Sequence, residues 1–315
     1  MIHPPNQYFD LSHFALLEIS GNDANEFLQN QIAGDVSKLH SSGWLFSAWC
    51  QPDGRVICTF ILFAEGTSLM LILPSMLKDK IINRLSKFIL RSKVTIKDVS
   101  DEYALIGLAG PDMYMILQTM HAGISGNANP KYQTEDLCIL RMWGKTPRSI
   151  LISRMDKVSA ILDRVLIAFT EGDRATWSLM DIEAGIPWIL EATSGAFLPQ
   201  MLNIDQMQGL SYQKGCYPGQ EVIARLHHRG QLKRRMYLGT CNNEVMPGPG
   251  DRLERTDTGT LAGDVIDAER NPDGGFSLLA VTEISAADGA PLRLHGTGQG
   301  HTELQSITYP AEHFL

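Results

Sequence analysis

The sequence predicts an α+β fold made of two α+β units and a C-terminal β-barrel. Over roughly the first two-thirds of the chain, helical patterns alternate with antiparallel hairpin patterns, which argues against a doubly wound parallel sheet. From about Leu232, short β-rich runs are separated by Pro- and Gly-rich turns, as in a small antiparallel barrel or sandwich. We therefore expect α+β units over residues 1–100 and 101–234, and a barrel over residues 235–315.

The first unit contains a hairpin and two helices. Strand patterns over 44–50 and 55–64 flank Gln51-Pro52-Asp53-Gly54, in which Asp-Gly is a strong hairpin signal. A third strand covers 67–73, and residues 20–23 have the pattern of a capping box. The helix after that box and a second helix over 76–89 have their expected buried faces at Ala24, Phe27, Leu28, Ile32 and at Leu77, Ile81, Leu85, Phe88, Ile89.

The same patterns predict the helices and strands of the second unit and the strands of the barrel. In the second unit, a helix is expected after Pro111 and another over 157–169. The expected strands cover 103–109, 137–143 and 149–153 in the second unit, and 235–240, 260–266 and 276–281 in the barrel.

Composition and charge exclude several classes of protein. The 315 residues are 44% hydrophobic and 20% charged, which is ordinary for a globular protein of more than one unit. The formal net charge of -8 argues against a general nucleic-acid binder, so no stable direct nucleic-acid binding is expected. The longest apolar runs are too short to span a bilayer, and the N-terminus lacks a secretory pattern. We expect a cytoplasmic protein without a membrane segment.

The cysteines indicate a reducing compartment. Their number is odd and no pair has Cys-x-x-Cys spacing, so neither a disulfide framework nor a structural zinc site is expected. Adjacent His227 and His228 diverge on a helix, so no metal site is predicted there either. Cysteines 50, 58, 138 and 241 are expected to be structural core residues.

The most unusual local chemistry surrounds Cys216. Gly215 and Gly219 flank it, Pro218 can start a helix, and Lys214 lies two residues upstream. A helix N-terminus and a cation both stabilise a thiolate, so these features favour a lowered thiol pKa. On these residues alone, a reactive thiol and a structural one remain equally open.

The same stretch is locally basic. Between positions 214 and 235 there are six Lys or Arg residues and one acid, Glu221, in an otherwise acidic chain. Either a solvated linker or an anion-binding site would explain this charge.

The segment Lys214-Gly215-Cys216-Tyr217-Pro218-Gly219-Gln220-Glu221 resembles the KGCYxGQE signature of the YgfZ family of folate-binding proteins. These are relatives of the T-protein, the aminomethyltransferase of the glycine cleavage system. Further matches follow in the family's order at residues 27–36, 53–56, 108–111, 181–187, 197–200, 202–203, 224–225 and 229–230.

The resemblance implies a fold, a ligand and site residues. The family fold is a pair of ferredoxin-like α+β units and a C-terminal β-barrel around a central opening that holds a reduced folate. Glu183 matches the T-protein glutamate that contacts the pteridine ring. Cys216 and Lys214 are the expected catalytic residues, and the further folate-binding residues are expected to be Tyr217, Gln220, Glu221 and Arg225.

Two positions depart from the relatives. Asp181 stands where the T-protein usually has Arg, which favours the YgfZ branch over a true aminomethyltransferase. Pro218 stands where Thr is common, which removes a hydroxyl and a backbone N–H from the motif.

Three functions remain open at this point. The resemblance favours a tetrahydrofolate-binding accessory protein for iron–sulfur cluster assembly or repair, which uses Cys216 and supports iron–sulfur client enzymes, including those that modify tRNA. A folate-dependent one-carbon transferase would depend on a carboxylate instead. A non-catalytic module would dock acidic partners through the basic segment. Whether the chain is an enzyme therefore stays undecided.

Overall fold

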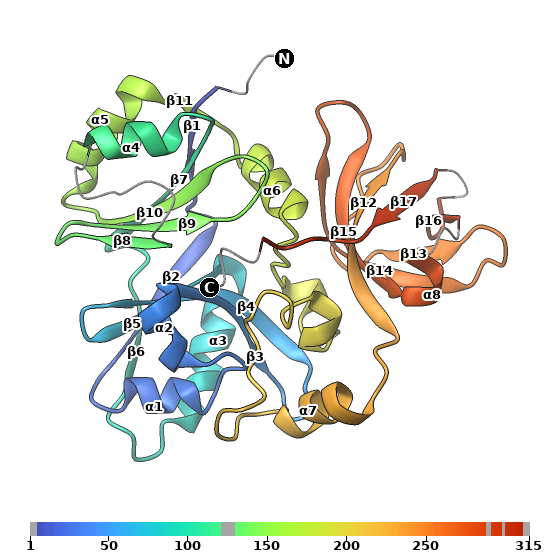
Figure 1. The fold of residues 1–315 in the computed structure, drawn as a ribbon, viewed down its shortest axis with the longest axis horizontal. Helices are drawn as coiled ribbons and strands as arrows, with labels where there is room; N and C mark the ends of the chain where they lie inside the picture. Colours follow the sequence, from blue (N-terminus) through green and yellow to red (C-terminus); the bar gives the residue numbers. More distant parts are fainter. Residues whose placement is uncertain (1–4, 121–129, 288–290, 298–299, 311–315) are drawn as a thin grey trace.

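The computed structural model describes residues 5–120, 130–287, 291–297 and 300–310. It has two units with one sheet each and a separate β-barrel (Figure 1). This arrangement confirms the predicted α+β class with a C-terminal antiparallel barrel.

The first sheet is antiparallel and has five strands. Their order is β3 (Trp44–Cys50), β4 (Val56–Glu65), β5 (Ser68–Pro74), β2 (Phe14–Ser20) and β6 (Thr95–Asp98). The helices of this unit are α1 (Ala24–Gln29), α2 (Leu39–Ser42) and α3 (Lys78–Leu85).

Every residue of β3 is buried because each face of the strand packs into a different core. Leu45 and Trp49 belong to the cluster that the unit's own helices cover, whereas Trp44, Phe46 and Ala48 belong to the cluster between the units. The alternation of side chains along a strand produces this division.

The predicted hairpin is confirmed, and the predicted helix over 76–89 is partly wrong. The Gln51 N–H donates to the Arg55 carbonyl at 2.8 Å and so closes the turn. The expected helix is instead α3 with a 3₁₀ turn at each end, Ser75–Leu77 and Ser86–Phe88. Phe88 is 48% exposed, since the tighter turn carries its side chain away from the core. Leu77, Ile81 and Leu85 are buried as expected.

The second sheet has six strands and includes the N-terminal strand of the chain. Its order is β11 (Thr170–Glu171), β1 (Gln7–Asp10), β7 (Tyr103–Ala109), β10 (Arg148–Arg154), β9 (Leu137–Met142) and β8 (Lys131–Gln133). Helices α4 (Met113–Met120) and α5 (Val158–Ala168) cover one face. Because β1 pairs with β7 and β11 while the next strand, β2, lies in the first sheet, residues 7–20 connect the two units. The boundary at residue 100 stays a prediction.

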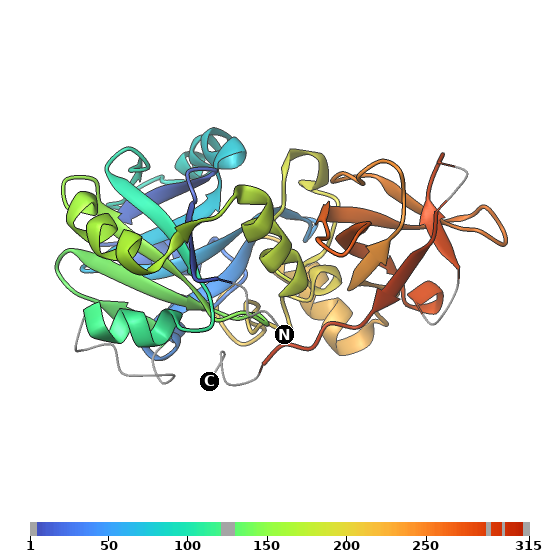
Figure 2. The same cartoon turned by 90° about the horizontal axis from the view of Figure 1, so that it is seen from above.

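Helix α6 (Arg174–Glu183) lies against the other face of this sheet and against the barrel. Asp173 caps the helix by accepting from the Thr176 N–H at 2.8 Å. Trp177 of the helix contacts Phe9 of β1, with 5.4 Å between the ring centroids. Helix α6 therefore sits where the second unit, the barrel and the connecting segment meet (Figure 2).

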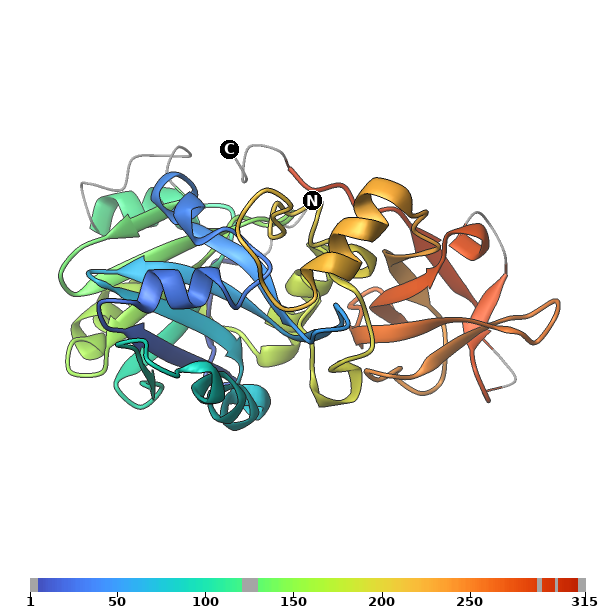
Figure 3. The ribbon, with the colours of Figure 1, turned by 90° about the horizontal axis from the view of Figure 1, so that it is seen from below.

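The barrel closes on itself with antiparallel neighbours. Its strands, in spatial order, are β12 (Arg234–Cys241), β15 (Phe276–Glu283), β14 (Leu261–Arg270), β13 (Arg252–Arg255), β16 (Leu292–Leu294) and β17 (Thr302–Gln305), and α8 (Ile284–Ala287) follows β15. Helix α7 (Gln220–Arg229) leads into the barrel and lies between it and the first unit (Figure 3). After β17 the chain returns toward α6, where Ile307 and Tyr309 pack on the central cluster.

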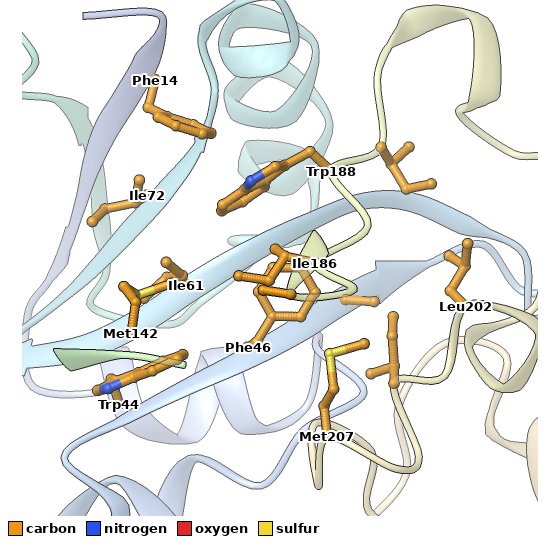
Figure 4. Packing of buried hydrophobic residues seen from close by; sticks show 14 of the residues in the cluster. Phe14, Trp44, Phe46, Ile61, Ile72, Met142, Ile186, Trp188, Leu202 and Met207 are labelled. Atoms are coloured by element: carbon orange, nitrogen blue, oxygen red, sulfur yellow. The ribbon is translucent and has the colours of Figure 1, made fainter. Parts of the chain in front are cut away.

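The central hydrophobic cluster joins both sheets to the segment after α6 (Figure 4). Trp188 contacts Phe46 of β3 and Phe14 of β2, with ring centroids 5.3 and 4.6 Å apart. The space between the two sheets is therefore filled around Trp188 by large apolar side chains.

The four cysteines predicted to be structural are buried. Burial raises the thiol pKa of Cys58 and Cys138 to about 12 and that of Cys241 to about 11. It raises the pKa of Cys50 further. Among the described residues, no helix has both the length and the apolar character needed to cross a membrane.

Candidate functional site

Lys214 anchors the loop that carries Cys216. Its ammonium donates to the backbone carbonyls of Gln29, Ile32 and Gly34 at 2.5, 2.6 and 2.6 Å. These bonds use all three N–H donors of the side chain and satisfy carbonyls at and beyond the C-terminal end of α1. Burial lowers the pKa of Lys214 to about 8. The three hydrogen bonds thus attach the Lys214 side chain to the first unit. The catalytic role of Lys214 stays a prediction.

Gly219 brings the motif against the tip of the β3–β4 hairpin. Its φ is +83°, and a Cβ atom at this position would lie 2.5 Å from the Cα of Gly54 and 2.6 Å from the Gln51 carbonyl. Only glycine permits both the backbone angle and this approach. The predicted hairpin turn thus forms the surface on which the motif rests.

Tyr217 and Gln220 fold the motif onto itself. The buried Tyr217 hydroxyl donates to the Ser211 carbonyl at 3.1 Å, and burial raises its pKa. The Gln220 amide donates to the Lys214 carbonyl at 3.3 Å. Ser211 in turn donates its N–H to the Ala33 carbonyl at 2.9 Å. These contacts fix the loop on both sides of Cys216.

Cys216 is exposed, unlike the other four cysteines. Helix α7 begins at Gln220, so Pro218 lies in the turn before the helix and the thiol lies four residues ahead of it. A rigid loop that presents an accessible thiol fits a reactive cysteine better than a structural one.

Glu221 and Arg225 form an ion pair on the exposed face of α7. Their closest atoms are 2.8 Å apart, and the side chains are 84% and 71% exposed. Such a pair contributes little to stability, so both groups remain available to a ligand or partner.

Two arginines at the end of the basic segment form ion pairs within the chain. Arg235 pairs with Asp205 at 3.0 Å, and Arg234 pairs with Asp264 of β14. The Arg234 pair lies within the barrel, and the Arg235 pair joins the start of the barrel to the segment before it. With the Arg225–Glu221 pair, three of the six basic residues of the segment therefore have an acidic partner.

Glu183 lies at the last helical position of α6, apart from the Cys216 loop. Its nearest cation is Lys145 at 3.9 Å, whose side chain is 69% exposed. A carboxylate at a helix C-terminus meets the negative end of the helix dipole, so its placement there is unfavourable without a donor. This arrangement suits a carboxylate that binds N–H groups of a ligand.

Two stacked tryptophans lie beside the backbone of Glu183. The Trp143 indole N–H donates to the Ala184 carbonyl at 2.9 Å, and the Trp44 ring stacks on Trp143 with centroids 5.2 Å apart and planes 5° apart. The Trp44 indole N–H is buried and has no hydrogen-bond partner among the described residues. An unsatisfied buried donor of this kind is rare and marks a place where a ligand or water can bind.

Arg148 and Asp181 form a buried ion pair that the sequence analysis missed. Their closest atoms are 2.7 Å apart, and the side chains are 0% and 5% exposed. Asp181 also accepts from the Trp188 indole at 2.9 Å, and Arg148 donates to the Trp143 carbonyl at 3.0 Å. One guanidinium nitrogen of Arg148 has no partner among the described residues. The two residues are 33 positions apart in the sequence, so no local sequence pattern predicts that they form an ion pair.

A pocket of about 610 Å³ lies where the two units and the barrel meet. It is lined by residues of β2, α6, the connecting segment and β14, among them His13, Arg174, Asp181, Trp188, Asp267 and Glu269. A β-bulge interrupts the pairing of β14 between Val265 and Asp267, and Asp267 lines the pocket. Burial raises the pKa of Asp267 to about 7, and the negative charge of Asp181 adds to this effect.

Neither this pocket nor a second one of about 540 Å³ between the two units is lined by Cys216 or Glu183. Six of the seven predicted residues lie in the Cys216 loop and the first turns of α7, whereas Glu183 lies at the end of α6. In the described part of the chain, no group of three metal-binding side chains is present.

The chain is similar in sequence to a known family model and to named proteins. The family model of the GCVT N-terminal domain matches residues 5–142. A protein named tRNA-modifying protein YgfZ from Colwellia psychrerythraea is 29% identical over 98% of this chain and 94% of its own length. The protein of the same name from Yersinia pseudotuberculosis is also 29% identical, over 97% of this chain and 93% of its own length. The chain is therefore similar to YgfZ proteins over nearly its full length and to the GCVT N-terminal domain over residues 5–142.

A solved structure extends the relationship to the whole fold. The glycine cleavage system aminomethyltransferase T from Bartonella henselae superposes with a TM-score of 0.81 at 16% identity, over 99% of this chain and 88% of that protein. The YgfZ/GcvT-like fold thus includes the barrel as well as both sheets, as the sequence resemblance implied.

We expect Lys214→Met to lower the melting temperature of the protein. The substitution keeps the apolar stem but leaves three carbonyls without their donor. A loss of about 2 kcal/mol, or about 4 °C for a chain of this size, should follow. Differential scanning fluorimetry measures the shift, with the exposed Lys233→Met as the matched control. Equal melting temperatures for the two variants would contradict the anchoring role.

We expect Asp267→Asn to change how stability depends on pH. The folded-state pKa of about 7 lies above the ordinary value of 3.8, so the contribution of this carboxyl to stability is full below about pH 4 and is lost as the pH rises to about 7. Asparagine removes that loss. From pH 5 to pH 8 the variant should gain about 2 to 3 kcal/mol relative to wild type, because about two pH units of the loss fall in this range.

Urea denaturation at both pH values measures this gain. The exposed Asp273→Asn in the β14–β15 turn is the control and should show no such gain. An equal effect of Asp267→Asn at pH 5 and pH 8 would show that Asp267 does not titrate in this range.

Proposed function

We propose that this chain binds tetrahydrofolate and supports tRNA modification in the cytoplasm by maintaining iron–sulfur enzymes, with Cys216 as its reactive group. The relatives named tRNA-modifying protein match the chain over nearly its full length, which supports the tRNA-related role. The observation that carries the proposal is the Cys216 loop, where an exposed thiol is held by contacts from separate parts of the chain.

The carboxylate of Glu183 supports the folate part of the proposal. A pterin presents adjacent N–H donors that pair bidentately with one carboxylate. Glu183 offers such a carboxylate with only a distant, exposed lysine as partner. The donors of the ligand would offset the unfavourable position at the helix end.

An aromatic pair lies in the core beside Glu183. Trp44 and Trp143 stack on each other and are 6% and 1% exposed, so they support the end of α6 from within the central cluster. The carboxylate of Glu183 is the group that a pterin would meet. Within this proposal, folate supplies a one-carbon carrier, and the chain's own groups bind and orient it.

Within this proposal, the Cys216 thiol is the group that takes part in maintaining the iron–sulfur enzymes. A reactive cysteine must be accessible and fixed, and Cys216 is both. Tyr217, Gln220, Glu221 and Arg225 adjoin it, and two of these fix the loop while the Glu221–Arg225 pair remains exposed. The exposed pair is where a folate tail or an acidic client protein would meet the loop.

A folate-dependent one-carbon transferase is the second candidate. The fold shared with the Bartonella henselae aminomethyltransferase favours it, although that likeness concerns the fold alone. In a transferase the essential group would be a carboxylate, and Cys216 would be dispensable. A module that docks acidic partners through Lys233, Arg234 and Arg235 is less favoured, because the two arginines are already paired within the chain.

We expect wild-type protein to bind tetrahydrofolate and Glu183→Gln to bind it at least about tenfold more weakly. The substitution replaces a charge-assisted pair of hydrogen bonds by a neutral acceptor and donor. Isothermal titration calorimetry measures both affinities. The exposed Glu191→Gln serves as the matched control and should bind like wild type.

A substitution in the pocket where the two units and the barrel meet tests the alternative position for the ligand. If Glu269→Gln weakened binding and Glu183→Gln did not, the ligand would lie in the pocket of about 610 Å³ and the proposed role of Glu183 would be wrong. Absence of binding by wild-type protein would rule out both folate-based functions.

We expect Cys216→Ala to lose the ability to restore iron–sulfur enzyme activity in a strain that lacks the endogenous protein. Removing the sulfur abolishes nucleophilic and metal-binding chemistry at this position. Activity of an iron–sulfur tRNA-modifying enzyme, measured in cell extract, is the readout. Cys138→Ala removes a buried thiol and should still complement. Full complementation by Cys216→Ala would favour the transferase.

A further inference from the structure

We infer that Tyr309, carried by the segment after the barrel, is a positioning residue that holds the C-terminal turn of α6 and so orients Glu183. The inference rests on the proposed function for the role of Glu183 in ligand binding. It adds a residue from the far end of the chain to that site, and it makes the barrel's return segment part of the site's support.

The C-terminal turn of α6 has the bonds of a Schellman motif. The Gly185 N–H donates to the Ile182 carbonyl at 3.0 Å, and the Ile186 N–H donates to the Asp181 carbonyl at 2.9 Å. Gly185 has a φ of +72°, the left-handed conformation that this motif requires. Glu183 is the last helical residue of this turn, so its side chain moves with the motif.

Tyr309 holds this turn from outside the helix. Its hydroxyl donates to the Gly185 carbonyl at 2.9 Å, which the Schellman bonds leave free. A Cβ atom at Gly185 would lie 2.8 Å from the Tyr309 hydroxyl and 2.7 Å from Ile307. The return segment therefore packs directly on the backbone two residues beyond Glu183.

The same hydroxyl belongs to a polar network that reaches the barrel. The Asn203 amide donates to the Tyr309 hydroxyl at 3.4 Å and to the Met236 carbonyl of β12 at 3.0 Å. Arg235 donates to the Asn203 side-chain oxygen at 3.1 Å and pairs with Asp205. Asn203 is buried, and its φ of +59° is a left-handed conformation in which asparagine is tolerated.

This network fixes the distance between the barrel and the end of α6. Each buried polar group in it has a partner, so moving the barrel would leave donors or acceptors unsatisfied. Tyr309 is the member that connects the network to α6. The orientation of Glu183 is therefore coupled to how the barrel sits on the rest of the molecule.

The test removes only the hydroxyl. Tyr309→Phe keeps the ring but loses the bond to Gly185, and we expect it to weaken tetrahydrofolate binding about fivefold in calorimetry. Tyr103→Phe is the matched control, because the Tyr103 hydroxyl lies 3.5 Å from Glu65 in another part of the molecule. It should bind like wild type. Unchanged affinity of Tyr309→Phe would overturn the inference.

A double-mutant cycle separates positioning from a general loss of stability. If Tyr309 acts through Glu183, the tyrosine substitution should have no further effect on affinity in a Glu183→Gln background. If the two effects simply add, Tyr309 does not act through Glu183 and the inference fails.

A ligand-free measurement keeps the inference separate from the proposed function. Hydrogen exchange of the Gly185 and Ile186 amides should be about fivefold faster in Tyr309→Phe than in wild type, because the turn loses its outside support. If wild-type protein failed to bind folate, the proposed function would fall, and this exchange rate alone would decide whether Tyr309 holds the turn. Equal exchange in both proteins would show that it does not.

Discussion

The buried ion pair between Arg148 and Asp181 is the interaction on which the centre of the molecule depends. Taking two charges out of water costs several kcal/mol for each ion, and their attraction offsets that cost only with good geometry and further hydrogen bonds. Here the pair is 2.7 Å long, Trp188 donates to the aspartate, and Arg148 donates to the Trp143 carbonyl. The pair thus fixes α6 against β10 of the second sheet and against the segment that follows the helix. Every other feature of α6 then has a defined place, including its contacts with the barrel and the position of Glu183 at its end.

The Cys216 loop is fixed by a different means, because its anchors are backbone groups. Lys214 donates to carbonyls near the end of α1, and Gly219 rests against the hairpin tip. Both contacts are made with backbone atoms of the partner residues and not with their side chains. They demand instead a long, charged donor at one position and the absence of a Cβ atom at the other. This explains in physical terms why the loop needs these two residue types.

Features set by local pattern were predictable from the sequence, whereas features set by distant pairing were not. The Asp53–Gly54 turn and the strand Tyr103–Ala109 were found because turn chemistry and apolar runs determine them locally. The entry of β1 into the second sheet was missed, because only tertiary pairing reveals it. The same holds for the site: Cys216 stood out by its setting, and Glu183 only through the family resemblance. The Tyr309 contact joins residues 124 positions apart, for which no sequence spacing gives a signal.

The two parts of the candidate site, the Cys216 loop and the end of α6 with Glu183, do not share an open pocket described above. Both contact the same hydrophobic cluster. Ala184, next to Glu183, and Tyr217, next to Cys216, both belong to the central cluster that the two sheets share. Protein interiors are packed at nearly crystalline density, so a displacement at one edge of such a cluster is passed on to its other members. The end of α6 and the Cys216 loop therefore both rest on the same packed core, through Ala184 and Tyr217. The exposed Glu221–Arg225 pair lies outside this core and contributes little to holding the loop in place.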